Sequence, residues 1–149
     1  MAPLTQAQVA SITEELMPHI STDEGKVKFG VGAYKAFLSV HPEYIQYFSK
    51  LNGLTIDNVF QSEGIKYYGR TLVDELVRMV SAAADDKKLE EILTSSAKAH
   101  TVRNIDKEKF MSGLPVFIEY FDKSLTKPEN RAAMQTFLNY IFPTISKEL

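Results

Sequence analysis

Three histidines, His19, His41 and His100, are the side chains in this sequence best suited to hold a metal. No two of them stand three or four residues apart, so the sequence predicts no multi-histidine metal site. His100 falls at helical spacing from Leu89 and Leu93, on the apolar face of a predicted helix. Two interpretations follow from this pattern: a core histidine bonded to a backbone carbonyl, or a metal ligand.

Two tyrosines, Tyr34 and Tyr68, stand on the apolar faces of two other predicted helices. A buried hydroxyl without a hydrogen-bond partner costs about 1–3 kcal/mol, so each phenol needs one. The partner is either a neighbouring protein group or a bound ligand, and the pattern leaves both open. Gly30 lies one turn before Tyr34, and Gly69 follows Tyr68. A glycine inside a helix usually has a packing reason, so this pair predicts a close helix crossing.

No other arrangement in the chain points to catalysis. Motifs for nucleophilic or phosphate-binding chemistry are absent, and acidic pairs such as Glu14-Glu15 and Glu90-Glu91 fit solvated helix faces. The chain has no cysteine, hence no disulfide framework and no thiolate site. Its net charge of −2 argues against nucleic-acid binding. No apolar run reaches about 18 residues, and no signal peptide is visible. We therefore expect a cytoplasmic protein without membrane association.

Helix start signals and helical periodicity account for the whole chain, and no strand alternation is visible. We expect an all-α fold of seven or eight helices in a single domain, residues 1–149. The expected segments are a helix capped by Thr5, a helix from Ser21 to about Ser39, a short helix from Pro42 to Phe48, a long helix from Thr55 or Asp57 to about Ala84, a helix from Asp85 past His100, a helix from Asp106 kinked at Pro115, and a last helix from Thr126.

The sequence resembles the globin family over nearly its whole length. The run AFLSVHPEYIQYF, residues 36–48, resembles the segment that joins the second and third globin helices, with Pro42 in the family position. The run KYYG, residues 66–69, resembles the start of the distal motif, and AKAH, residues 97–100, resembles the proximal motif. Each motif alone is weak, but the ordered set with compatible spacings is specific.

The resemblance implies a globin fold around a haem b cofactor. The implied haem-site residues are His100 as the iron ligand, Phe48 stacked on the haem, Leu72 over the iron, Tyr34 and Tyr68 as hydrogen-bond donors to oxygen, and Lys50 and Arg103 as partners of the propionates. The second ring nitrogen of a ligating histidine normally donates to a nearby acceptor, and the Ser96 carbonyl, one turn back, is the candidate.

Tyrosine at both distal positions, without a distal histidine, resembles the haemoglobins of parasitic flatworms, the trematodes. It implies reversible binding of molecular oxygen at very high affinity, for transport, storage or scavenging, by a protein that is not an enzyme. The alternative is a haem enzyme, a peroxidase or a nitric-oxide dioxygenase, and the dioxygenase needs a reductase as partner. Phenols with pKa near 10 fit the acid–base role of a peroxidase poorly. A third interpretation is a helical interaction module without haem. A monomer is compatible with the sequence.

Overall fold

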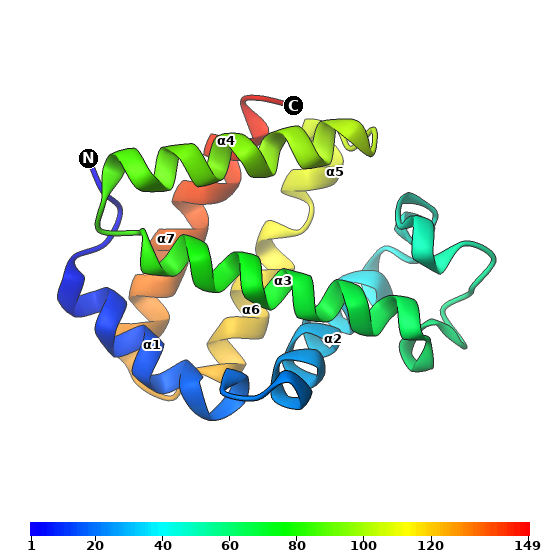
Figure 1. Cartoon of the computed structure of the whole chain (residues 1–149), viewed down its shortest axis with the longest axis horizontal. Helices are drawn as coiled ribbons and strands as arrows, with labels where there is room; N and C mark the ends of the chain where they lie inside the picture. Colours follow the sequence, from blue (N-terminus) through cyan, green and yellow to red (C-terminus); the bar gives the residue numbers. More distant parts are fainter. The chain divides into compact units, whose positions relative to one another are not determined.

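The computed structural model describes all residues, 1–149, and every regular element is helical, which confirms the expected all-α class. Seven α-helices form the chain, and three short 3₁₀-helices connect the second to the third (Figure 1). The elements are α1 (Gln6–Ile20), α2 (Asp23–Val40), η1 (Pro42–Tyr47), η2 (Ser49–Leu51), η3 (Val59–Gln61), α3 (Glu63–Ser81), α4 (Asp86–Val102), α5 (Lys107–Met111), α6 (Leu114–Ser124) and α7 (Pro128–Ser146). No helix has the length and apolar character needed to cross a membrane.

Side-chain caps fix the starts of the first two helices. In α1 the Thr5 hydroxyl accepts the Gln8 N–H at 3.1 Å, and the Gln8 side chain accepts the Thr5 N–H at 2.9 Å, which confirms the predicted capping box. In α2 the cap is Thr22, whose hydroxyl accepts the Gly25 N–H at 2.9 Å. The predicted start at Ser21 is therefore wrong by one residue, because Thr22 has the extended backbone of a cap.

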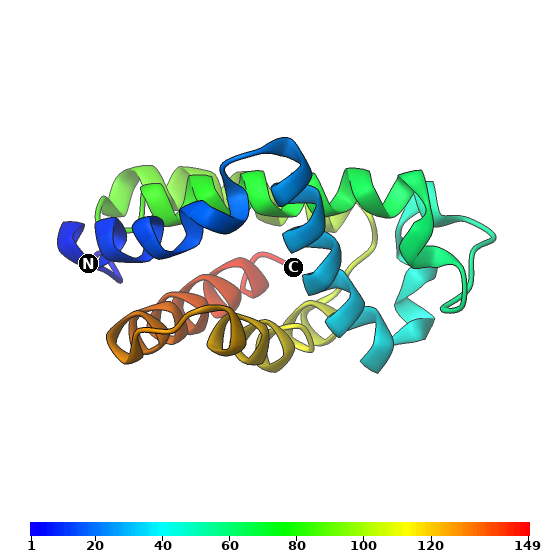
Figure 2. The same ribbon diagram turned by 90° about the horizontal axis from the view of Figure 1, so that it is seen from below.

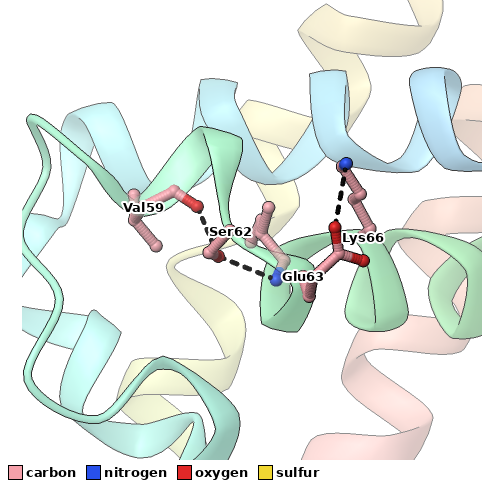
Figure 3. A network of polar contacts seen from close by, with 5 residues as sticks. Val59, Ser62, Glu63 and Lys66 are labelled. Carbon is pink, nitrogen blue, oxygen red and sulfur yellow. Dashed lines mark hydrogen bonds and ion pairs between the residues drawn. The ribbon is translucent and has the colours of Figure 1, made fainter.

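Helix α3 begins later than the sequence predicts. The Ser62 hydroxyl accepts the Ile65 N–H at 3.1 Å and donates to the Val59 carbonyl at 2.7 Å (Figure 3). It thereby ends the 3₁₀-helix η3 and starts α3 at the next residue. The predicted start at Thr55 or Asp57 is wrong, because both residues lie in the turn before η3.

A break divides the helix predicted from Asp106. The Asp106 carboxylate accepts the Lys109 N–H at 2.9 Å and caps α5, as expected. Helix α5 ends at Met111, and α6 begins at Leu114 with Pro115 in its first turn. A proline fits a first turn, where its missing N–H has no helical partner, so Pro115 starts a helix where a kink was predicted.

Contacts divide the chain into two compact units, residues 17–76 and residues 1–16 with 77–149. Within the 17–76 unit, α2 and α3 meet at Gly30 and Gly69. A Cβ added to Gly30 would overlap the Gly69 carbonyl oxygen, and a Cβ added to Gly69 would lie 2.8 Å from the Val31 nitrogen. The predicted close crossing at the two glycines is confirmed, and the two helices touch through their backbones.

An apolar cluster fills the 17–76 unit beside this crossing. Its buried members are Leu38, Ile45, Phe48, Leu51, Val59, Ile65 and Tyr68. Four of these residues come from the connection between α2 and α3, which Figure 2 shows in cyan to green. The short helix expected at residues 42–48 is the 3₁₀-helix η1 of this connection. The connection is thus a part of the core.

The other unit is built on α7, which contacts α4, α5 and α6 (Figure 1). Its inward face is buried at Phe137, Leu138, Ile141 and Ile145, as the helical spacing predicts. The unit therefore has its own apolar core, in which α4, α5 and α6 pack against α7.

A polar network joins Glu15 on α1 to the start of α7. The Glu15 carboxylate accepts the Asn130 amide at 2.8 Å, the Thr126 hydroxyl at 3.0 Å, and the backbone N–H groups of Thr126 and Lys127. Asn130, only 1% exposed, also donates to the Ser11 carbonyl at 3.2 Å. Burial alone raises the pKa of Glu15, but these hydrogen bonds outweigh it and lower the pKa from 4.5 to about 2.

We expect Gly30→Ala to lower the free energy of unfolding by about 1–3 kcal/mol, because the new Cβ forces the two helices apart. An alanine at an open helical position would instead stabilise by up to about 1 kcal/mol, so the sign of the change is informative. Gly113→Ala is the matched control, since a Cβ there meets its nearest neighbour at 3.4 Å. Chemical denaturation measures the free energy of unfolding of both variants. Unchanged or higher stability of Gly30→Ala would contradict the close crossing.

The lowered pKa of Glu15 stabilises the fold at pH above 4.5, and this contribution is lost as the pH falls toward 2. Glu15→Gln should therefore be less stable than the wild type near neutral pH, and the two stabilities should converge in acid. Urea unfolding at several pH values from about 7 to about 3 measures the difference. The exposed neighbour offers the control Glu14→Gln. A difference that does not change with pH would rule out this role for the carboxylate.

Candidate functional site

His100 is half-buried in the last turn of α4. Its Nδ1 lies 2.8 Å from the Ser96 carbonyl oxygen, the partner expected from the sequence. Because a carbonyl can only accept, Nδ1 carries the proton and Nε2 carries the lone pair. A ring whose second nitrogen is held in this way has the tautomer and the fixed orientation of a metal ligand.

Aromatic rings lie beside His100 in the same compact unit. Phe110 of α5 meets the His100 ring edge-on, with ring centres 4.8 Å apart, and Phe142 of α7 stacks on Phe110 at 4.8 Å. Phe117 of α6 lies 5.9 Å from Phe142. None of the three could be assigned to a site from the sequence, because aromatic residues at helical spacing are typical of any core. Only their approach to His100 in space distinguishes them.

In the 17–76 unit, Tyr34 and Tyr68 both pack edge-on against Phe48. The ring centres lie 5.4 Å apart for Tyr34 and 5.0 Å apart for Tyr68. Phe48 and Tyr68 are buried, and Tyr34 is half-buried. The close crossing explains this arrangement, because Gly30 lies one turn before Tyr34 on α2 and Gly69 follows Tyr68 on α3. Three residues that the sequence places on separate elements therefore form one aromatic group.

The turn after Phe48 holds the Tyr68 hydroxyl. The hydroxyl accepts the Lys50 backbone N–H at 3.1 Å and lies 3.4 Å from the Ser49 hydroxyl. Leu51, fully buried, anchors the same turn, η2, in the core. A phenol oxygen carries one proton besides its lone pairs, so accepting the Lys50 N–H directs that proton toward a different acceptor. This partner of Tyr68 was not predicted from the sequence.

The other residues expected to contact the haem, Leu72, Lys50 and Arg103, lie at three different elements. Leu72 is half-buried on α3, one turn after Tyr68. The Lys50 ammonium lies 4.7 Å from the centre of the Tyr67 ring, a cation–π contact. Arg103 is exposed at the end of α4, where its backbone N–H donates to the carbonyl of the proposed ligand, His100, at 3.1 Å.

The structure thus places the expected site residues in two sets. The 17–76 unit holds Tyr34, Phe48, Lys50, Tyr68 and Leu72, and the other unit holds His100 and Arg103. Tyr34 and Tyr68 both contact Phe48, and the Lys50 backbone N–H bonds to the Tyr68 hydroxyl. Each unit therefore presents its own part of the expected site.

The two remaining histidines have ordinary local partners. His41 stacks on Tyr44 with ring centres 4.7 Å apart, and its Nδ1 lies 3.7 Å from the Glu43 carboxylate. His19 lies 5.2 Å from the Phe29 ring. Both therefore fit a role at the protein surface or at a helix end.

The donor set around His100 fits a haem iron better than a bare metal ion. A bare zinc ion takes several protein ligands, and no group of three or more histidine, cysteine or acidic residues that could hold an ion occurs in the chain. A haem iron needs a single axial nitrogen from the protein and otherwise apolar or aromatic surroundings. His100, with its oriented ring and its phenylalanine neighbours, offers that chemistry.

Comparisons with known sequences show close relatives. The chain matches the globin family profile over residues 31–145. A globin of Isoparorchis hypselobagri is 39% identical over 147 residues, which cover 98% of this chain and 99% of that one. A globin of Dicrocoelium dendriticum is 43% identical over 143 residues, with coverages of 96% and 94%. Both organisms are trematodes, which confirms the resemblance to flatworm globins.

Comparisons with solved structures show the same fold. Ferric myoglobin of Aplysia limacina superposes with a TM-score of 0.79 at 16% identity, covering 97% of this chain and 98% of that one. The haemoglobin of the botfly Gasterophilus intestinalis gives a TM-score of 0.78 at 15% identity, with coverages of 97% and 98%. Likeness at this identity concerns the fold alone, and it confirms the expected globin fold. With the sequence relatives, it follows that the chain belongs to the globin family, whose cofactor is haem b.

Proposed function

We propose that this protein binds molecular oxygen reversibly and at very high affinity, for transport, storage or scavenging, and that the whole chain acts as one globin domain. The observation that carries the proposal is the convergence of two phenols, Tyr34 and Tyr68, on Phe48. Family membership supplies the haem, and the two phenols supply hydrogen-bond donors that are suited to a polar ligand.

We assign His100 as the iron ligand through Nε2. The bond from Nδ1 to the Ser96 carbonyl supports this role, because it fixes the tautomer and the direction of the ring. Haem held by a neutral imidazole supplies an iron with one open coordination position for oxygen. Phe48 and Leu72 would add apolar contacts to the haem and exclude water, which slows oxidation of the iron.

Tyr34 and Tyr68 would donate hydrogen bonds to oxygen. A hydrogen bond to a partly charged acceptor is worth about 1.5–3 kcal/mol. Since each 1.4 kcal/mol is tenfold in affinity, one such donor slows oxygen release by about 10- to 100-fold. Carbon monoxide accepts hydrogen bonds less well, because it draws less electron density from the iron. The two phenols would therefore discriminate in favour of oxygen.

Lys50 and Arg103 are the proposed partners of the haem propionates. Lysine and arginine side chains are common partners of carboxylates. The Lys50 ammonium is held at the Tyr67 ring, next to the Tyr68 position. Arg103 stands at the end of the helix that carries His100. Each of the two proposed partners thus belongs to a different part of the expected site.

We expect His100→Gly to lose its haem during purification and to regain a haem spectrum when imidazole is added. Free imidazole would enter the space left by the side chain and supply the missing nitrogen. Visible absorption of the reduced protein, with and without imidazole, measures the effect. His19→Gly makes the same chemical change at an exposed helix end and should keep its haem. A five-coordinate ferrous spectrum in His100→Gly without imidazole would show that another residue binds the iron.

We expect Tyr34→Phe and Tyr68→Phe each to raise the oxygen dissociation rate at least about tenfold, because each removes one donor while keeping the ring. Release of carbon monoxide should change little. Stopped-flow displacement of both ligands measures the rates, with Tyr140→Phe on α7 as the matched control. An unchanged oxygen off-rate in either variant would remove that tyrosine from the mechanism. Rapid peroxide turnover by the wild type would favour the haem-enzyme alternative.

A further inference from the structure

The position of the Tyr68 hydroxyl depends on the backbone of Lys50, and the position of that backbone depends on a glycine. The Lys50 N–H donates to the Tyr68 hydroxyl at 3.1 Å. The carbonyl oxygen of the same residue lies against Gly64 in the first turn of α3. A Cβ on Gly64 would overlap this oxygen and lie 2.9 Å from the Leu51 side chain. Only a glycine lets the 49–51 turn lie this close to α3.

Helix geometry places both contacts of Lys50 on one face of α3. Gly64 and Tyr68 are four residues apart, so they stand one above the other on successive turns. The Lys50 carbonyl faces the first of them, and the Lys50 N–H bonds to the second. The Lys50 ammonium also contacts the neighbouring Tyr67 ring at 4.7 Å. A displacement of the turn at Gly64 would therefore move the amide away from the Tyr68 hydroxyl.

We propose that Gly64 is a positioning residue for oxygen binding, acting through the Lys50 amide on the Tyr68 hydroxyl. The inference rests on the proposed role of Tyr68 as a donor to oxygen. The bond from the Lys50 N–H to one lone pair of the phenol oxygen holds the hydroxyl in one orientation. The phenol also becomes a stronger donor, because hydrogen bonds in a chain polarise one another. The Ser49 hydroxyl, 3.4 Å from the phenol oxygen, belongs to the same arrangement.

The test combines Gly64→Ala with Tyr68→Phe in the full-length haem-loaded protein. Gly64→Ala should raise the oxygen dissociation rate about threefold or more, because the phenol loses its fixed orientation, and should leave carbon monoxide release unchanged. In the Tyr68→Phe background the same substitution should have no further effect. Ser49→Ala should behave similarly with a smaller increase. Ser39→Ala, the same change at an exposed site on α2, is the control.

A second measurement does not depend on oxygen. Hydrogen exchange of the Lys50 amide, followed by NMR in the carbon monoxide form, should be faster in both Gly64→Ala and Tyr68→Phe than in the wild type. Ser39→Ala should leave it unchanged. If Gly64→Ala does not fold, Gly64→Ala with Leu51→Val relieves the side-chain overlap and keeps the backbone one, with Leu51→Val alone as its control.

The outcomes separate this inference from the proposed function. A faster oxygen release in Tyr68→Phe together with unchanged release and unchanged Lys50 exchange in Gly64→Ala would overturn the role of Gly64 alone. Effects of the two substitutions that simply add would also overturn it, because Gly64 would then act by another route. An unchanged off-rate in Tyr68→Phe would instead overturn the donor role of Tyr68, on which the inference rests.

Discussion

The backbone contact between α2 and α3 determines where the two proposed oxygen-binding phenols lie. Gly30 and Gly69 have no Cβ, so the helices approach until one backbone touches the other. Tyr34 stands one turn beyond the first glycine, and Tyr68 stands next to the second. The separation of the two rings is therefore set by a contact between rigid helices, and Phe48 fits against both. A larger residue at either glycine would push the two helices apart. It would thereby increase the separation of the two tyrosines without changing either side chain.

Backbone groups orient the two polar side chains on which the proposed function depends most. The Ser96 carbonyl accepts a hydrogen bond from His100 Nδ1, and the Lys50 amide donates one to the Tyr68 oxygen. Each bond occupies one hydrogen-bonding position of its side chain and so fixes how that side chain is oriented. This agrees with the wider structure, in which no buried side-chain nitrogen or oxygen lacks a partner.

Interactions local to one helix could be predicted from the sequence, and interactions with irregular backbone could not. The capping box at Thr5 and the bond from His100 to Ser96 join residues three or four apart, so helical geometry alone brings them together. The late start of α3 depends on Ser62, one of several polar residues in a stretch without periodicity. The Lys50 amide that holds Tyr68 has no side-chain signature at all, because every residue except proline carries the same group.

The group that accepts the hydrogen bond from His100 Nδ1 also affects how strongly the ring would donate electrons to an iron. A carboxylate in that position would draw the Nδ1 proton, give the ring part of the character of an imidazolate and raise its basicity as a ligand. The Ser96 carbonyl has a much weaker pull than a carboxylate, so it gives the ring little of this character. Strongly donating axial ligands favour cleavage of the O–O bond. The proposed ligand His100, whose Nδ1 is bonded to a peptide carbonyl, would donate less strongly, which fits the proposed reversible binding of oxygen.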